Sequence, residues 1–187
     1  MKKIVAYTAL ALVLSLLALI LLSWLLSATM TVGVRSLLSS EGIRWFFGHF
    51  TDIMLRPQLV WLILLAMAWG AFKQSGMASV PSKKMRVFLL ILLSLYVGVI
   101  LLLTAIPHAV LLSATGTLWP SPFSQALVPI VAFGVTMLSV AYGVLSGTFH
   151  SLSSVCQALS WGIGACAPLF LLYILFMQFY GSLCFVF

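Results

Sequence analysis

Charged side chains are scarce in this sequence. Asp, Glu, Lys and Arg together make up 6% of its 187 residues, whereas a soluble domain carries about a quarter. Hydrophobic residues make up 64%. This composition excludes a soluble globular domain and predicts an all-α integral membrane protein, because α-helices satisfy their own backbone hydrogen bonds inside the bilayer.

Acidic side chains are the scarcest of the charged groups, since Glu41 and Asp52 are the only two. Carboxylates inside the membrane are the usual proton and cation relays of secondary transporters. No apolar run long enough to be a span contains one. The chain therefore lacks the usual acidic groups for coupling transport to an ion gradient.

Cysteine is also sparse, and Cys156, Cys166 and Cys184 lie in or near apolar runs without metal-ligand spacing. Such thiols behave as small hydrophobic side chains. The sequence has no paired carboxylates, no Gly-x-Ser-x-Gly and no phosphate-binding loop. His150 and Ser151 are adjacent in sequence, which does not bring a base face to face with a nucleophile. We expect no enzyme activity, no catalytic residue, no metal and no cofactor.

The positive charges are confined to the first half of the chain. All nine Lys and Arg residues lie before Val87 and flank apolar runs. The formal net charge of +7 therefore reflects the positive-inside rule rather than nucleic-acid binding. Lys2, Lys3 and the basic loop 73–86 indicate the inside. We expect a protein of the bacterial cytoplasmic membrane with its N-terminus inside and, after five spans, its C-terminus outside.

Long apolar runs predict five spans in a single membrane domain that covers residues 1–187. The first run is too long for the apolar core of a cleaved signal peptide, which has about 7–15 residues, so we expect an uncleaved anchor. The second run is short, and would thin the bilayer or pack inside protein. The predicted spans are residues 4–26, 59–73, 87–106, 125–145 and 158–180.

The segments after the third span are predicted from their lack of charge. Residues 109–124 read as an outer-face hairpin or interfacial loop, 146–157 as a small polar loop, and 181–187 as an apolar tail in the outer interface. Pro129 and Pro168 lie inside the last two spans, where proline removes a backbone donor and can kink a helix.

Residues 41–55 read as an amphipathic helix on the outer face. Ser40 is a suitable N-cap, and Glu41 follows at the positive end of the helix dipole. Pro57 ends the element, because the residue before a proline avoids helical geometry. A helix with an aromatic stripe and few charges usually lies in the membrane interface. The apolar stripe at helical spacing comprises Ile43, Phe46, Phe47, Phe50 and Met54.

Residues 37–77 contain a more specific pattern. LLSSEGIRW is followed by a proline, an apolar run and GAFKQSGM. This resembles the first periplasmic segment and second helix of the p-aminobenzoyl-glutamate transporter (AbgT) family. The matching residues are Leu37, Leu38, Ser39, Glu41, Gly42, Ile43, Arg44, Trp45, Pro57, Gly70, Ser75, Gly76 and Met77.

The resemblance implies an AbgT-like membrane transporter for p-aminobenzoyl-glutamate-like anions or antimetabolites of similar shape. Members of that family are much longer chains, and their acidic, glycine-containing core motif has no counterpart here. The resemblance therefore leaves two possibilities. The chain is a minimal transporter that works as an oligomer or with a partner, or a remnant that keeps the scaffold without the coupling chemistry.

A cluster of small polar residues in the charge-free half is the candidate binding segment. Hydroxyls and main-chain N–H groups beside glycine could hold an anion, and the AbgT-like family has a similar glycine- and serine-rich break. The alternatives are a plain cytoplasmic turn or small residues that let helices pack closely. A lone histidine here could relay protons or be structural. The candidate substrate-binding residues are Ser146, Gly147, Thr148, His150 and Ser151.

A second function fits the same composition. Charge-free helices are stable when surrounded by lipid or protein, and need no ligand. The chain could therefore be a non-transporting structural subunit of a larger membrane complex. In both cases its partners are the lipid bilayer and either further copies of itself or other membrane subunits.

Overall fold

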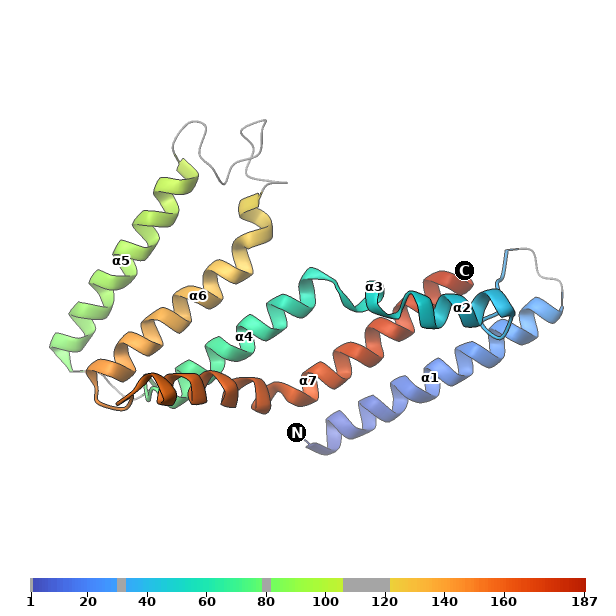
Figure 1. Ribbon diagram of the computed structural model, residues 1–187, viewed down its shortest axis with the longest axis horizontal. Helices are drawn as coiled ribbons and strands as arrows, with labels where there is room; N and C mark the ends of the chain where they lie inside the picture. Colours follow the sequence, from blue (N-terminus) through green and yellow to red (C-terminus); the bar gives the residue numbers. More distant parts are fainter. Residues whose placement is uncertain (1, 30–32, 79–81, 106–121) are drawn as a thin grey trace. The chain divides into compact units, whose positions relative to one another are not determined.

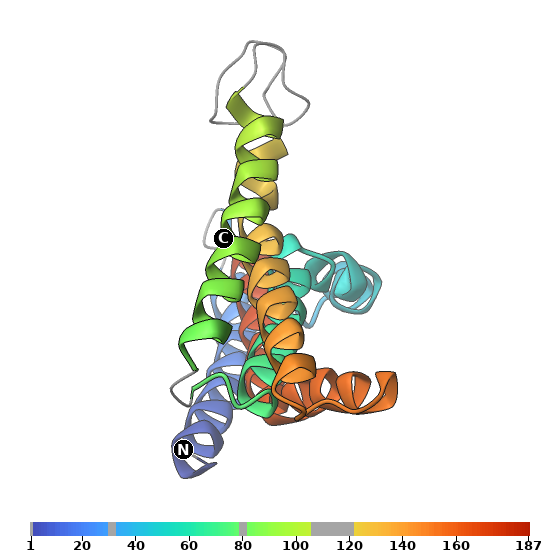
Figure 2. The ribbon, with the colours of Figure 1, turned by 90° about the vertical axis from the view of Figure 1, so that its left-hand side faces the viewer.

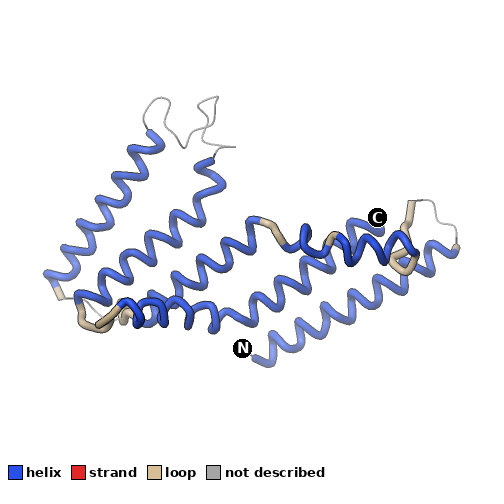
Figure 3. Tube along the Cα trace, in the orientation of Figure 1, coloured by secondary structure: helices blue, strands red, loops and turns tan. Residues whose placement is uncertain are grey.

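The computed structural model describes residues 2–29, 33–78, 82–105 and 122–187 (Figure 1). Helices and short loops make up these residues, with no strand among them, as Figure 3 shows, which confirms the predicted all-α fold class. Residues 109–121 of the loop predicted over 109–124 lie outside the described residues. Its last three residues begin α6. The helices are α1 (Lys2–Ala28), α2 (Ser40–Gly48), α3 (Phe50–Met54), α4 (Pro57–Gln74), α5 (Lys83–Ala105), α6 (Pro122–Leu145) and α7 (Leu152–Val186).

Four helices within the described ranges are long and apolar enough to cross a membrane. They are α1, α5, α6 and α7. The 18 residues of α4 cover the second predicted span and extend about 27 Å, slightly less than the hydrocarbon thickness of about 30 Å. Crossing of the membrane by α4 stays a prediction.

The last helix is longer than the predicted span 158–180. It has 35 residues and includes both the end of the predicted polar loop and most of the predicted tail. The early start has a local cause. The Ser151 N–H donates to Ser154 Oγ and the Ser154 N–H donates to Ser151 Oγ, both at 3.3 Å, which is a reciprocal helix cap. The tail continues the helix because its backbone and apolar side chains pack in a core.

The chain divides into two compact units. Unit 1 comprises Met1–Val60 and Ala167–Phe187, and unit 2 comprises Trp61–Cys166. The boundaries fall within α4, after Val60, and within α7, just before Pro168, which has no N–H to donate to the preceding turn.

The core of unit 1 is formed by α1, α2 and the end of α7. Leu19, Leu37, Phe185 and Val186 are buried together, and the Trp45 ring stacks on Phe185 with 4.4 Å between centroids. The connector before α2 is fixed by two backbone N–H groups. That of Arg35 donates to Val186 O at 3.0 Å, and that of Leu37 donates to Ser23 Oγ at 3.1 Å.

The amphipathic element differs from the prediction in two respects. Ser39, not Ser40, is the N-cap, because its Oγ accepts the Gly42 N–H at 3.0 Å. The helix predicted over 41–55 is broken at His49 into α2 and α3. Gly48 precedes the break, and glycine is a poor helix former.

The predicted apolar stripe divides in the same way. Phe46 packs against the core of unit 1, and Met54 is buried. Ile43, Phe47 and Phe50 remain exposed by 48%, 75% and 43%. These three side chains are available to the membrane interface.

Unit 2 contains a close crossing of α4 and the first part of α7. A Cβ atom built on Gly70 would lie 2.7 Å from Gly162 N, and one built on Gly162 would lie 2.7 Å from Gly70 N. Ala66 and Ala158 lie one turn before these glycines and are also buried. Small residues four apart on both helices are typical of close helix contacts in membranes.

The helices α5 and α6 run side by side within unit 2 (Figure 2). The Tyr96 hydroxyl on α5 donates to Ile130 O on α6 at 2.7 Å. The basic residues predicted in a loop lie instead at helix ends. Lys73 is in the last turn of α4, with Nζ 5.3 Å from the centroid of Trp69, and Lys83, Lys84 and Arg86 begin α5.

Candidate functional site

The candidate binding segment connects α6 to α7 within unit 2. Its turn depends on Gly147, whose φ of 73° lies in the left-handed region that favours glycine. The hydroxyls of Ser146 and Thr148 are 3.0 Å apart, and those of Ser151 and Ser153 are 2.8 Å apart. The segment is therefore ordered by its own polar groups.

Most backbone N–H groups of this segment have internal acceptors. Ser146 donates to Tyr142 O at 2.8 Å, and Gly147 donates to Val144 O at 3.2 Å. Thr148 and Phe149 both donate to Gly143 O, at 2.8 and 2.9 Å. These bonds cap the end of α6. The main chain is thus engaged in ending the helix, and a ligand would have to be held by side chains.

Phe149 anchors the segment to α6. Its ring is buried, with 7% of the side chain exposed, and lies directly against Gly143. A Cβ atom at position 143 would overlap the ring, which would then have to shift.

A groove of about 270 Å³ lies beside the segment. Its walls come from the end of α4, from the segment and from the first three turns of α7, all in unit 2. Among the described residues, no charged side chain lines it. The lining residues are Gln74, Thr148, Phe149, Ser154, Gln157, Ala158 and Trp161.

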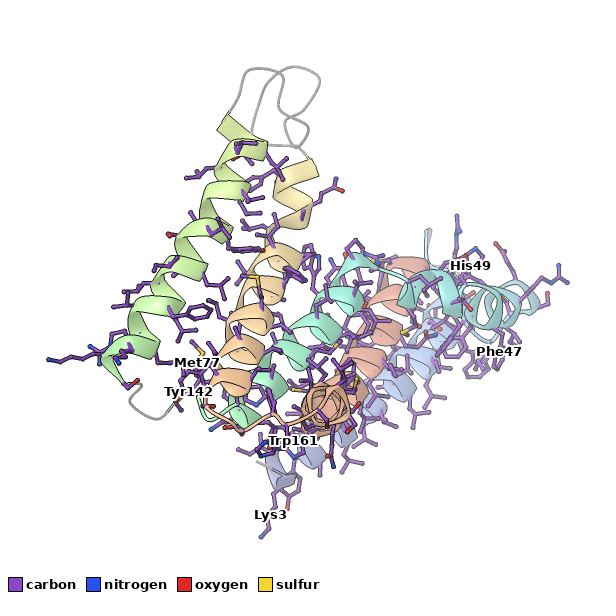
Figure 4. The ribbon with its side chains drawn as sticks, turned by 60° about the vertical axis from the view of Figure 1, so that its left-hand side comes forward. Lys3, Phe47, His49, Met77, Tyr142 and Trp161 are labelled. Carbon is purple, nitrogen blue, oxygen red and sulfur yellow. The ribbon has the colours of Figure 1, made fainter. Side chains whose placement is uncertain are left out.

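The α4–α7 crossing positions the walls of the groove. Gln74 lies one turn after Gly70 on α4, and Trp161 is adjacent to Gly162 on α7. Because the two glycines allow the backbones to touch, side chains next to the crossing meet at one end of it. Figure 4 shows Trp161 on α7; its side chain is 45% exposed.

The groove offers neutral hydrogen-bonding groups and an aromatic surface. The carboxamides of Gln74 and Gln157 can both donate and accept, and the Thr148 hydroxyl can do the same. The Trp161 ring can stack on a flat ring and donate through its indole N–H. This arrangement suits an aromatic solute with polar substituents, and would hold an anion without a counter-charge.

The sequence-based residues overlap this groove only in part. Of the five candidates, Thr148 lines the groove, whereas Ser146, Gly147, His150 and Ser151 do not. Ser146 and Ser151 instead stabilise the two helix ends, and His150 is exposed.

The sequence analysis missed Gln74, Gln157 and Trp161. Gln157 and Trp161 are four residues apart, which places them on one helix face, and this spacing was visible in the sequence. Gln74 comes from a distant segment, and only the helix crossing brings it near the other two.

In α2, two residues of the AbgT-like pattern pack inside unit 1 and two lie on its surface. Gly42 is buried against the backbone of Leu37, where no side chain fits. Trp45 stacks on Phe185 in the core of unit 1. Glu41 and Arg44 are exposed on the surface of α2.

The later residues of the pattern begin and end α4. Pro57 is the first residue of the helix, where its missing N–H costs nothing. Ser75 is fully buried; its Oγ donates to Phe72 O at 3.0 Å and accepts the Met77 N–H at 3.3 Å. Gly76 has a φ of 74°, which the turn after the helix requires.

Comparisons with known proteins support the fold. No protein-family model matches the sequence, and no curated protein matches it. The structure is similar to the crystal structure of the YdaH transporter of Alcanivorax borkumensis, which has an unusual topology. The TM-score is 0.78 at 14% sequence identity, over 94% of this chain and 70% of that chain. The chain is therefore an all-α integral membrane protein whose fold is similar to that of the YdaH transporter.

Proposed function

We propose that this chain is a membrane transporter for small aromatic anions of the p-aminobenzoyl-glutamate type, or for antimetabolites of similar shape. The observation that carries the proposal is the likeness in fold to a transporter over 94% of the chain. The resemblance at residues 37–77 supports the same family, and the groove in unit 2 offers a place for the solute.

The chemistry of the groove defines how such a solute would be held. The aryl ring stacks on Trp161, and the polar groups bond to Gln74, Gln157 and Thr148. A groove without a positive charge holds an anion weakly. Since no carboxylate lies within the described parts of α4–α7, transport should not depend steeply on a pH gradient.

The orientation follows from the basic helix ends. Lys73, Lys83, Lys84 and Arg86 cluster at the end of α4 and the start of α5, and Lys3 begins the first span. Lys and Arg favour the cytoplasmic side. In this proposal the N-terminus lies on the inner side of the cytoplasmic membrane. Helices α2 and α3 lie on the outer face, and the C-terminus is outside.

Cysteine labelling tests this orientation. Gly48→Cys in α2 and Ala78→Cys after α4, each in a chain whose three native cysteines are serine, should react with an impermeant maleimide from opposite sides. Gly48 and Ala78 are both exposed, so a cysteine side chain fits at either position without strain. Reaction of both from the same side of the membrane would overturn the five-span topology.

The exposed helices support assembly with neighbours. Only 6% of the span window of α5 and 11% of that of α1 are buried within the chain. Lipid, further copies of the chain or other membrane subunits would cover these surfaces. The same observation, with the charge-free second half, favours the alternative of a non-transporting structural subunit.

Transport in proteoliposomes separates the two functions. Wild-type protein should accumulate labelled p-aminobenzoyl-glutamate at the same rate with and without an imposed pH gradient. Trp161→Leu and Gln157→Leu should each lower apparent affinity about two- to tenfold, because each removes one stacking or hydrogen-bonding contact. Trp69→Leu and Gln58→Leu are matched controls, since both are exposed on α4 and outside the groove.

The outcome against transport is equally defined. Flux no greater than in empty liposomes, from protein that unfolds cooperatively in detergent, would refute autonomous transport and leave the structural-subunit function. Equal loss of affinity in the groove variants and in the Trp69 and Gln58 controls would refute the groove as the binding site.

A further inference from the structure

Two polar side chains are buried without partners in unit 1, on the last part of α7. Gln178 is 4% exposed and Ser182 is fully buried. They are one helical turn apart and share a face of the helix. Among the described residues, Gln178 Nε2, Gln178 Oε1 and Ser182 Oγ have no hydrogen-bond partner.

Other buried hydroxyls of unit 1 are bonded. Ser23 Oγ donates to Ile20 O at 2.8 Å and accepts the Leu37 N–H at 3.1 Å. Ser36 Oγ accepts the Leu38 N–H at 3.2 Å. Unit 1 therefore satisfies its buried polar groups elsewhere. An unsatisfied carboxamide costs stability, and polar groups retained at such a cost are often functional.

The surroundings of the pair are apolar. Val186, one turn after Ser182, packs in the core with Leu19 of α1, so this face of α7 is directed inward. On the adjoining face, Met177 packs with Ile53 and Met54 of α3. Every charged side chain described in unit 1 is exposed. A charged ligand group at the pair would leave water for these apolar surroundings, which is strongly unfavourable.

We propose that Gln178 and Ser182 form a second binding site, which takes an uncharged hydrogen-bonding group, a carboxamide, of the solute. The Gln178 carboxamide offers one donor and one acceptor side by side, which match the acceptor and donor of such a group. The Ser182 hydroxyl supplies a third bond. The assignment rests on the proposed transport function, because a site closed from solvent in one conformation and opened in another is what alternating access uses.

Ligand-dependent thermal stability in detergent tests the site with the whole chain. The probe is 4-aminobenzamide, and 4-aminobenzoate, an anion at pH 7, is the comparison. The carboxamide should raise the unfolding temperature of the wild type in a concentration-dependent manner. The benzoate should bind at least about tenfold more weakly, since its charge must be desolvated.

Variants of the pair should separate ligand binding from stability. Gln178→Met removes the polar atoms at similar volume, so it should raise the unfolding temperature without ligand and weaken carboxamide binding about tenfold or more. Ser182→Ala should weaken binding about threefold. Ser23→Ala is the matched control, because that hydroxyl is bonded; it should lower the unfolding temperature and leave carboxamide affinity unchanged.

The contrary results are distinct from failure of transport. Equal binding of benzoate and benzamide, or unchanged benzamide affinity in Gln178→Met, would overturn the site whether or not the protein transports. If Gln178→Met lowered the unfolding temperature as much as Ser23→Ala does, the Gln178 amide would be hydrogen-bonded and structural. That result would also overturn the proposed site. A benzamide shift that depends on Gln178 in protein without flux would support the site and refute transport alone.

Discussion

Replacing Gly70 or Gly162 with alanine perturbs the closest helix crossing in unit 2. At either position the new Cβ atom would meet a carbonyl oxygen of the partner helix and the N and Cα atoms of the opposite glycine, the last two at 2.7 Å. Carbon atoms in contact normally lie about 3.5–4.0 Å apart. Backbone cannot move aside as a side-chain tip can, so α4 and α7 would have to separate by about 1 Å.

The magnitude follows from this displacement. Forcing an extra carbon into a close-packed contact costs about 1–3 kcal/mol. Such a loss lowers the unfolding temperature by roughly 2–12 °C in a chain of this length. Once one alanine has separated the helices, the second should cost less. The double variant should therefore lose less than the sum of the single variants, with a coupling energy of about 0.5–3 kcal/mol.

Gly164→Ala is the matched control for both variants. It lies on the same helix, two residues from Gly162, with no atom within 4 Å of a new Cβ. Alanine is a better helix former than glycine, so this variant should be neutral or more stable by up to about 1 kcal/mol. The measurement is thermal unfolding in detergent, followed by circular dichroism. Equal tolerance of alanine at positions 70, 162 and 164, or full additivity of the two crossing variants, would refute the close crossing.

Three further variants test local contacts by thermal unfolding. Ser39→Ala should lose about 0.5–2 kcal/mol of stability, because it removes the N-cap of α2, whereas Ser40→Ala should not. The opposite order would support Ser40 as the N-cap, as the sequence predicted. Tyr96→Phe should lose about 0.5–1.5 kcal/mol with its hydrogen bond to α6, whereas the exposed Tyr7→Phe should be neutral; equal effects would argue against that bond. Phe149→Ala should cost about 3–5 kcal/mol, because the buried ring anchors the α6–α7 segment, and a loss under about 1 kcal/mol would contradict that role.

The sequence predicted the fold class because the decisive signal is compositional. Scarce charge and long apolar runs require helices that satisfy their own backbone, whatever the tertiary packing. Helix ends were harder to predict, since short-range polar contacts decide them. Ser151 and Ser154 start α7 before the predicted span by capping each other, and Gly48 breaks the amphipathic element that periodicity presents as continuous.

The groove could not be read from the sequence for a different reason. Its polar walls are glutamines, a serine, a threonine and a tryptophan, residue types that have no motif of their own. Gln74 joins Gln157 only through the Gly70–Gly162 crossing. The same holds for Gln178, which is visible as one amide in an apolar run, whereas its burial and its unpaired atoms depend on how α7 packs in unit 1.

The residues of the AbgT-like pattern have structural roles, so the resemblance carries information about the fold and none about the solute. Gly42 permits a backbone contact, Trp45 fills a core, and Ser75 and Gly76 end a helix. Each of these roles specifies geometry and none contacts the groove. The pattern therefore indicates a fold, which agrees with the TM-score of 0.78 to the YdaH transporter at 14% sequence identity. The groove residues lie outside the pattern and are neutral. Under the proposed function, discrimination between solutes would therefore rest on ring stacking and hydrogen-bond pairing rather than on charge.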